Sequence, residues 1–213
     1  MQRIFHGKAR GVRVRHMVDL YSGLGCASES MVRAGWSVLR IENNPLLSAV
    51  PFTVMQDVKL LRWKVNFRQD IRPIDLIWAS PPCRDFSNAY GSPKSIHARE
   101  HGIESYKPDM SLLEAAIAII EKVKPKYWVI ENVVGSIKYF EKYLGKPRQI
   151  IGPYVLWGNF PFLEVDDAQL TPKKKKDKTS THPLRSNHKA CVDYAISDAL
   201  RIAIEQQKSI TDF

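Results

Sequence analysis

The chain has 213 residues, of which 44% are hydrophobic and 25% are charged, a composition typical of a folded domain and not of a disordered chain. Its 32 basic and 22 acidic residues give a formal net charge of +10, which favours a polyanionic partner such as nucleic acid. The three cysteines show no zinc-ligand spacing, so we expect no disulfide framework, no structural metal and a reducing compartment. The longest wholly apolar run, residues 115–120, is too short to cross a bilayer, so no membrane partner is expected.

The N-terminal stretch is basic. Its first sixteen residues contain no acid and five cationic side chains, namely Arg3, Lys8, Arg10, Arg13 and Arg15. Because this stretch also lacks an apolar segment, we expect no secretory signal and a cytoplasmic protein. We interpret residues 1–11 as a basic arm, with an organelle transit peptide as the alternative.

A βαβ unit is predicted next in the chain. Residues 12–20 are the first expected strand, Ser22-Gly-Leu-Gly25 is the turn after it, and a helix should begin near Ala27. Gly35 and the apolar run 37–41 complete the unit. Glycine lets the backbone approach a ligand and a helix start offers N–H groups, which favours a cofactor at this turn over a plain tight turn.

Acidic residues follow the next two predicted strands. Glu42 and Asn43 come directly after the run 37–41, and Asp57 follows the short run 51–55. A carboxylate at the end of the second strand can accept hydrogen bonds from both hydroxyls of a ribose. The alternatives are a solvated Glu42 and a turn-forming Asp57.

Cys83 follows two prolines and a mostly apolar run. The run, residues 74–79, has the pattern of a strand that is buried on both faces of a parallel sheet. Pro81 and Pro82 end that strand and stiffen the backbone that presents the thiol. A lone cysteine is more often a small buried side chain, but this placement favours a nucleophile.

Residues 84–108 form a long polar stretch with no regular pattern. A loop of this length is usually functional or disordered. Because it is basic and follows a predicted nucleophile, we interpret it as a flap that closes over bound nucleic acid, and the alternative is a mobile surface loop.

The second half of the chain continues the alternation of helices and strands. Ser111-Leu-Leu-Glu114 has the pattern of a capping box at the start of a core helix, which Pro125 ends. The run 127–130 is the next predicted strand, and it delivers Glu131 and Asn132 to the same sheet edge as the cysteine. The remaining expected elements are a helix over 135–144, a strand over 154–158, an antiparallel strand from 163–170 and a final helix capped by Asp193.

Three of these segments resemble the cytosine-5 DNA methyltransferases, which transfer a methyl group from S-adenosylmethionine to carbon 5 of cytosine. They occur in the order of that family: Asp19-Leu-Tyr-Ser-Gly-Leu-Gly-Cys-Ala-Ser28, Pro81-Pro-Cys83 and Trp128-Val-Ile-Glu-Asn-Val133. The resemblance runs from residue 17 to about residue 160, with a weaker similarity in the last helix. It implies an α/β fold of the Rossmann-like class I methyltransferase type, a mainly parallel sheet with helices on both faces, in a single domain of residues 1–213.

The resemblance also implies a binding site for S-adenosylmethionine. In that family the acid after the second strand binds the ribose and the Asp after the third strand accepts from the adenine amino group. The residues expected at the cofactor are Asp19, Tyr21, Ser22, Gly23, Gly25, Glu42, Asn43, Asp57 and Pro81.

The implied reaction uses Cys83 and Glu131. The thiolate of Cys83 adds to carbon 6 of cytosine and makes carbon 5 nucleophilic, while the carboxylic acid of Glu131 neutralises the charge that develops at N3. Asn132 is expected to orient Glu131. A base stacked in a duplex is out of reach, so the base must be flipped out or arrive in a single strand.

The sequence departs from the family in the segments that bind substrate. Arg84 stands where the family usually has Gln, and Arg148 is the nearest match to an arginine that helps to hold the cytosine. Only about 25 residues separate Phe162 from Asn187, where the family usually inserts a target-recognition domain, and they include the basic loop 171–182. The predicted substrate-binding residues are Arg84, Ser87, Arg148, Lys173, Lys174, Lys175 and Lys176.

The sequence therefore indicates a DNA cytosine-5 methyltransferase whose sequence recognition is reduced or supplied by a separate specificity subunit. An RNA cytosine-5 methyltransferase is the nearest alternative, because a relative with the same Cys and Glu acts on tRNA. A catalytically silent nucleic-acid-binding subunit with the same fold is the third interpretation. The compact chain suits a viral, prokaryotic or mobile-element enzyme.

Overall fold

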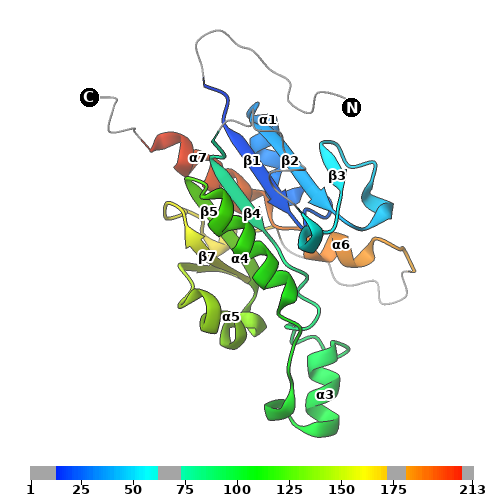
Figure 1. The fold of residues 1–213 in the computed structure, drawn as a ribbon. Coiled ribbons are helices and arrows are strands. Elements are labelled where there is room, and N and C mark those ends of the chain that lie inside the picture. Colours follow the sequence, from blue (N-terminus) through cyan, green and yellow to red (C-terminus); the bar gives the residue numbers. More distant parts are fainter. Residues whose placement is uncertain (1–12, 62–72, 172–180, 208–213) are drawn as a thin grey trace.

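A mixed β-sheet forms the centre of the computed structural model, which describes residues 13–61, 73–171 and 181–207 (Figure 1). In this part of the chain, seven strands are arranged in the order β3-β2-β1-β4-β5-β7-β6. The strands are β1 (His16–Leu20), β2 (Ser37–Glu42), β3 (Thr53–Met55), β4 (Leu76–Ala79), β5 (Tyr127–Val133), β6 (Gln149–Ile151) and β7 (Tyr154–Asn159). The first five are parallel, and β7 is antiparallel to both of its neighbours. The predicted α/β architecture, a mainly parallel sheet with helices on both faces, is confirmed.

The central strands are buried on both faces. Every residue of β1, β2 and β4 is buried, and such strands read as nearly continuous apolar runs because helices cover both sides of the sheet. Two charged side chains lie in the interior of these runs, Asp19 in β1 and Arg40 in β2, and a third, Glu42, ends β2. All three belong to the site described below.

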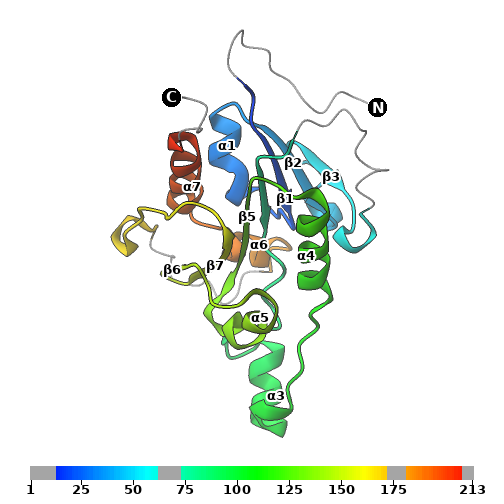
Figure 2. The same cartoon turned by 60° about the vertical axis from the view of Figure 1, so that its left-hand side comes forward.

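Helices pack on both faces of the sheet (Figures 1 and 2). The α-helices of the described residues are α1 (Glu29–Arg33), α3 (Pro93–His101), α4 (Ser111–Val123), α5 (Ile137–Leu144), α6 (Arg185–Ala190) and α7 (Tyr194–Gln206), and α1, α4, α5 and α7 cover the sheet. One apolar cluster joins α1 and α7 to the face that carries Trp78, and another joins α4 and α5 to the face that carries Ile77. None of the described helices has the length and apolar character of a membrane span.

The predicted flap contains a helix. In both views α3 projects away from the sheet, and the segment that leads to it follows the end of β4 (Figures 1 and 2). The Ser92 hydroxyl accepts from the N–H of Ser95 at 3.2 Å, and Pro93 occupies the first helical turn. The expectation of a stretch without pattern is therefore wrong, and the Ser-Pro pair is the helix-start signal that could have revealed the helix.

The edges of several other elements differ from prediction. β1 begins at His16, later than the predicted residue 12. Residues 163–170 do not form a strand but include a short 3₁₀ turn at Asp167–Gln169. The antiparallel strand is β7, and the three-residue β6 that pairs with it was too short to show a period in the sequence.

The capping box predicted for α4 is absent. Met110 occupies the cap position, and the carboxylate of Asp109 accepts from the N–H and the hydroxyl of Ser111 at 2.9 and 3.0 Å. Glu114 instead accepts from the hydroxyl of Tyr143 at 3.1 Å. The start of the helix is thus fixed by a residue two positions earlier than the pattern indicated. By contrast, the predicted cap of α7 is confirmed, since Asp193 accepts from the N–H of Ala195 at 3.0 Å.

Two of the three cysteines are paired, contrary to the prediction. Cys26 forms a disulfide with Cys191 across 165 residues of sequence, and their Cα atoms are 5.5 Å apart. The pairing arises because α7 packs against α1, a tertiary contact that cysteine spacing cannot show. The reducing compartment was expected because the cysteines showed no pairing pattern, and the disulfide removes that reason. Cys83 does not take part in the disulfide.

Candidate active site

The carboxyl ends of parallel strands bring the predicted site segments to one edge of the sheet. The glycine turn follows β1, Glu42 ends β2, Asp57 follows β3, Cys83 follows β4 and Glu131 lies in β5. Because β1 lies between β2 and β4, the glycine turn is flanked by the predicted cofactor acids on one side and by Cys83 on the other. This edge is where open α/β sheets bind ligands.

The glycine turn has a left-handed backbone at several positions. Gly23 and Gly25 have φ angles of 54° and 78°. The N–H of Ser22 donates to the carbonyl of Ile41 at 3.1 Å, and the N–H of Gly25 donates to the carbonyl of Ser22 at 2.7 Å. A Cβ atom on Gly25 would collide with the guanidinium of Arg40, so this position requires glycine for space as well as for conformation.

Glu42, the predicted ribose ligand, already holds the glycine turn. One carboxylate oxygen accepts from the N–H of Gly23 at 2.8 Å, and the other accepts from the N–H groups of Asn43 and Asn44 at 3.0 and 2.9 Å. A carboxylate offers about four acceptor positions, so roughly one remains for a ligand hydroxyl. The alternative of a solvated Glu42 is wrong, because the residue is only 9% exposed.

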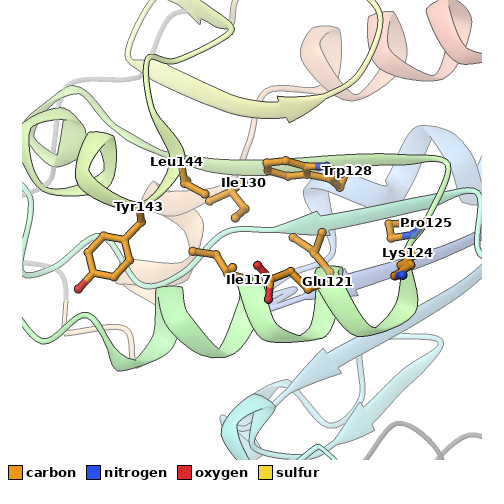
Figure 3. Close-up of a pocket in the computed structure, with 9 residues that line it drawn as sticks. Ile117, Glu121, Lys124, Pro125, Trp128, Ile130, Tyr143 and Leu144 are labelled. Atoms are coloured by element: carbon orange, nitrogen blue, oxygen red, sulfur yellow. The ribbon is translucent and has the colours of Figure 1, made fainter.

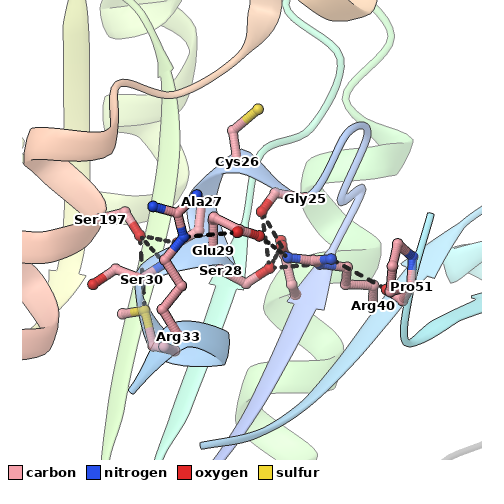
Figure 4. A network of polar contacts seen from close by, with 12 residues as sticks. Gly25, Cys26, Ala27, Ser28, Glu29, Ser30, Arg33, Arg40, Pro51 and Ser197 are labelled. Atoms are coloured by element: carbon pink, nitrogen blue, oxygen red, sulfur yellow. Dashed lines mark hydrogen bonds and ion pairs between the residues drawn. The ribbon is translucent and has the colours of Figure 1, made fainter. Parts of the chain in front are cut away.

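Arg40 is a site residue that the sequence analysis missed (Figure 4). It is 2% exposed, and its guanidinium donates to the hydroxyl of Ser28 at 2.9 Å, the carbonyl of Gly25 at 3.0 Å and the carbonyl of Pro51 at 3.1 Å. It also pairs with Glu29 at 3.3 Å. One side chain therefore fixes the end of the turn, the start of α1 and the loop before β3. A lone arginine in the apolar run 37–41 was the signal that could have revealed it.

Asp19 is a buried acid next to this network. It is 1% exposed, and one of its oxygens accepts from the hydroxyl of Ser28 at 2.6 Å. Burial raises the pKa of Asp19 to about 6, although the Ser28 hydrogen bond and the charge of Arg40 act in the opposite direction. Its other oxygen and the hydroxyl of Ser22 are buried without hydrogen-bond partners among the described residues. Such unsatisfied atoms are uncommon and mark places where a ligand can bind.

Tyr21 and Asp57 form the side of the site toward β3. Tyr21 has a φ of 59°, and its hydroxyl donates to the carbonyl of Leu112 at 2.7 Å. Burial and, to a smaller extent, the charge of Asp57 raise the pKa of Tyr21. Asp57 accepts from the N–H of Lys59 at 2.8 Å, so it does form a turn, as the alternative interpretation held. Asn43 is exposed at the rim of the site.

Cys83 lies in a tight turn that is anchored in the core. Its carbonyl accepts from the N–H groups of Phe86 and Ser87 at 3.1 and 3.0 Å. The ring of Phe86 is buried and packs edge-on against Phe140 of α5, with 5.0 Å between ring centroids. The thiol itself belongs to a residue that is only half-buried. The backbone around the predicted nucleophile is therefore fixed while the side chain remains accessible.

Asn132 does not have the role that was predicted for it. Its side-chain amide donates to the carbonyl of Pro81 at 2.8 Å, and its side-chain oxygen accepts from the N–H of Val133 at 2.9 Å. Consecutive residues of a strand point to opposite faces, so Asn132 and Glu131 cannot share a face of β5. Asn132 instead ties the cysteine turn to the strand that carries Glu131.

Glu131 is buried within β5, opposite Leu156 of β7. Burial raises the pKa of Tyr154 to about 12, and the charges of Asp193 and Glu131 add to this effect. The hydroxyl of Tyr154 donates to the carbonyl of Cys191 at 3.3 Å. The segment between α6 and α7, which the disulfide fixes to the start of α1, therefore lies close to the predicted acid.

The predicted substrate-binding residues are less closely grouped. Arg84 is exposed, while Ser87 accepts from the N–H of Ala89 at 3.1 Å within the flap. The guanidinium of Arg148 lies 5.5 Å from the ring centroid of Phe160, beside the pair of β6 and β7. The lysines 173–176, most of the basic loop 171–182 and the basic arm 1–11 lie outside the described residues.

One cavity lies away from this edge (Figure 3). It has a volume of about 540 Å³ between α4, α5 and β5, and its lining includes Ile117, Trp128 and Tyr143. None of the predicted site residues lines it. This cavity is therefore separate from the candidate active site.

Residues 16–144 match the family described as C-5 cytosine-specific DNA methylase. The match runs from β1 to α5 and includes the glycine turn, Cys83 and Glu131. The chain belongs to this family. The predicted resemblance to cytosine-5 DNA methyltransferases is thereby confirmed.

Individual relatives are similar over part of their length. A Frog virus 3 protein named "Probable DNA (cytosine-5)-methyltransferase" is 31% identical over 124 residues, which are 54% of this chain and 52% of that protein. The solved structure of the Entamoeba histolytica methyltransferase EhMeth is 14% identical, with a TM-score of 0.46, over 78% of this chain and 58% of that one. The solved structure of the S. pombe Dnmt2 methyltransferase is 21% identical, with a TM-score of 0.38, over 61% of this chain and 36% of that one. The chain thus spans about half the length of the curated relative that it matches.

Membership of the C-5 cytosine-specific DNA methylase family implies S-adenosylmethionine as the methyl donor. The described residues fit such a group, because buried acceptor and donor atoms of Asp19 and Ser22 are unsatisfied and Glu42 retains an acceptor position. A Cβ atom built on Gly23 meets only the side-chain nitrogen of Asn187, at 3.9 Å, so α6 lies over the turn. Asn187 and α6 were not predicted to be part of this site.

Proposed function

We propose that this C-5 cytosine-specific DNA methylase transfers a methyl group from S-adenosylmethionine to carbon 5 of cytosine in DNA, through a covalent bond between Cys83 and carbon 6. The observation that carries the proposal is the hydrogen bond of 2.8 Å from Asn132 to the carbonyl of Pro81. It fixes the turn that presents Cys83 against the strand that holds Glu131. A nucleophile and an acid that act on one ring need such a fixed relative position.

Cys83 and Glu131 divide the chemistry between them. The thiolate of Cys83 attacks carbon 6 of the cytosine, and the electron pair of the 5,6 double bond becomes available at carbon 5. Glu131 donates a proton or a strong hydrogen bond to N3, where negative charge develops. S-adenosylmethionine, when bound, supplies an electrophilic methyl group. Loss of the proton from carbon 5 and expulsion of the Cys83 thiolate then restore the aromatic ring.

The cofactor site is proposed at the glycine turn. Gly23 and Gly25 allow close approach of the ligand, and Asp19, Ser22 and Glu42 offer polar atoms to it. Asp57 is proposed to accept from the adenine amino group with the carboxylate oxygen that is not used by the N–H of Lys59. Tyr21, Asn43 and Pro81 complete the proposed set.

Nucleic acid is the proposed partner of the flap and of the basic loop. The net charge of +10 favours a polyanion, and α3 carries Lys94, Arg99 and two histidines. Tyr90 is 81% exposed, and the guanidinium of Arg99 lies 4.0 Å from its ring centroid, a pair that can stack on an unpaired base. Arg148 is proposed to help hold the cytosine, Arg84 and Ser87 are proposed to contact the substrate, and phosphate contacts are proposed for the lysines 173–176. A specificity subunit is proposed to supply base recognition, since phosphate contacts position a protein without reading sequence.

Trapping with 5-fluorocytosine tests the covalent mechanism. A fluorine at carbon 5 cannot leave as a proton after methyl transfer, so the protein should remain attached to the base through Cys83. We expect a denaturation-resistant adduct when wild-type protein, S-adenosylmethionine and fluorinated DNA are combined. Cys83→Ser should form no adduct, and Glu131→Gln should form little.

Fluorinated RNA serves as the parallel substrate. An adduct with RNA alone would transfer the proposed activity to the RNA cytosine-5 methyltransferase alternative. DNA binding without an adduct or methyl transfer would favour the catalytically silent subunit. Methylation of ordinary cytosine by Cys83→Ala would contradict the covalent mechanism itself.

A further inference from the structure

A second cavity lies between the flap and α5, and its residues have no part in the proposed reaction. It has a volume of about 240 Å³. Asn88, Lys94 and Ser95 of the flap form one side of its polar lining, and Lys138 and Tyr139 of α5 form the other. The cavity therefore joins the flap, which follows Cys83, to the helix that follows Glu131.

Lys94 places a buried positive charge in the wall of this cavity. The residue is 8% exposed, and its ammonium donates to the carbonyls of Phe86 at 2.8 Å and of Gly135 at 3.3 Å. A Cβ atom on Gly135 would collide with the Phe86 carbonyl and the lysine ammonium, so this close approach requires glycine. Two carbonyls use two of the three N–H donors and leave the positive charge without a negative partner.

Lys138 brings a second positive charge to the same cavity. Burial lowers the pKa of Lys94, and the charge of Lys138 lowers it further, so the two ammonium groups repel one another. Among the described residues, no acidic side chain forms an ion pair with either lysine. Two like charges in a partly enclosed space destabilise one another unless an anion lies between them.

The neutral groups of the lining can also donate hydrogen bonds. Asn88 and Ser95 carry an amide and a hydroxyl, and the hydroxyl of Tyr139 is buried without a hydrogen-bond partner in the described part of the chain. Tyr139 as a whole is 8% exposed. The lining thus combines five donor side chains with no carboxylate. This is the donor set that binds an oxyanion through charge-assisted hydrogen bonds.

We propose that this cavity binds one phosphate group of the nucleic-acid backbone close to the base that Cys83 attacks. The inference rests on the proposed function, because it is the flap's position beside the cysteine turn that selects a backbone phosphate over other anions. Lys94 holds the carbonyl of Phe86, whose N–H is bonded to the carbonyl of Cys83. A phosphate shared by Lys94 and Lys138 would fasten the flap to α5 and keep the cysteine turn in place. Inorganic phosphate has the same chemistry, so the test separates the two.

The variant for the test is Lys138→Gln in the full chain. Lys138 is exposed on α5, so its replacement leaves the core intact, whereas the ammonium of Lys94 also supports two carbonyls. Lys142→Gln is the matched control, because Lys142 is exposed on the same helix and does not line the cavity. Binding of a double-stranded DNA is measured by fluorescence anisotropy at several salt concentrations. We expect Lys138→Gln to bind the DNA roughly three- to tenfold more weakly than the wild type. The slope of log affinity against log salt concentration should become shallower by about one unit, with little change in Lys142→Gln.

Melting of the wild type and of Lys138→Gln with inorganic phosphate is the second arm. Loss of DNA affinity in Lys138→Gln alone, with no stabilisation by inorganic phosphate, supports a backbone site. Equal DNA affinities of Lys138→Gln and Lys142→Gln would overturn the backbone site. Selective stabilisation of the wild type by inorganic phosphate would then assign the cavity to a free anion. Methyl transfer by the wild type is measured separately, so failure of the proposed reaction is distinguishable from failure of this site.

Discussion

The side-chain amide of Asn132 donates a hydrogen bond of 2.8 Å to the carbonyl of Pro81, and this bond joins the two strands that carry the candidate catalytic residues. β4 and β5 are neighbours in the sheet, with Ala79 opposite Ile130. The bond extends their pairing beyond the end of β4, where the proline pair prevents further strand formation. The Cys83 turn is therefore positioned by β5 and not only by its own strand.

Asn132→Asp should lower activity without weakening the cofactor site. The carboxylate can still accept from the N–H of Val133 but cannot donate to Pro81, so the cysteine turn loses its attachment to β5. We expect kcat/KM for DNA to fall by about tenfold to a hundredfold. Adduct formation with 5-fluorocytosine DNA measures the attack directly, and calorimetry measures cofactor affinity.

Asn159→Asp is the control, because Asn159 makes the same type of bond to Lys126 at the other end of β5, at 3.1 Å. Equal losses in both variants would contradict a specific role for Asn132.

Arg40→Met should destabilise the protein and disturb the glycine turn. The change leaves the carbonyls of Gly25 and Pro51 and the hydroxyl of Ser28 without their donor in a buried place. The expected loss of stability is about 3–5 kcal/mol, measured by urea unfolding. Arg33→Gln is the control, since Arg33 is exposed and pairs with the same Glu29 on the surface. Similar stabilities for the two variants would show that the buried network around Arg40 is not required.

Asp19 should make the protein less stable as the pH rises from about 4 to 6. Burial raises the pKa of Asp19 in the folded state to about 6, so between these pH values the folded protein holds a proton that the unfolded chain has released. The stability gained from that proton is present below the unfolded pKa and is lost as the pH passes the folded pKa, in total about 3 kcal/mol.

Asp19→Asn removes this titration. The unfolding free energy of the variant should exceed that of the wild type at pH 7, and the difference should shrink toward pH 4. Urea unfolding at several pH values in the absence of cofactor measures it. A constant difference between the two proteins at all pH values would show that Asp19 titrates in the ordinary range.

The disulfide should stabilise the contact between α1 and α7. In the same buffer without reductant, Cys191→Ser should have an unfolding free energy about 2–4 kcal/mol lower than the wild type, because its unfolded chain is no longer cross-linked. A reductant should lower the stability of the wild type to the same level and should leave Cys191→Ser unchanged. Thiol titration after denaturation without reductant should find the Cys83 thiol alone. Three reactive thiols in that titration would contradict the cross-link.

The sequence by itself determined the elements whose evidence is local. Apolar runs of strand length predicted β1 to β5 and β7, and the glycine turn, Glu42, Asp57 and Cys83 lie at strand ends as expected, because parallel strands share one carboxyl edge. Glu131 was expected just after a strand that ends at residue 130, but β5 continues to Val133 and Glu131 lies within it. The amphipathic stripe of α4 and the Asp193 cap of α7 were equally local.

Only the tertiary structure decided which side chains contact and position the site residues. The partners of Arg40, Asn132 and Lys94 come from other segments, and Cys26 and Cys191 meet across 165 residues. Periodicity reports which face of an element is buried, but it contains no information on the atoms that the face meets. The choice of partner depends on the packing of elements distant in sequence, and therefore the fold was predictable here while the contacts that position the site were not.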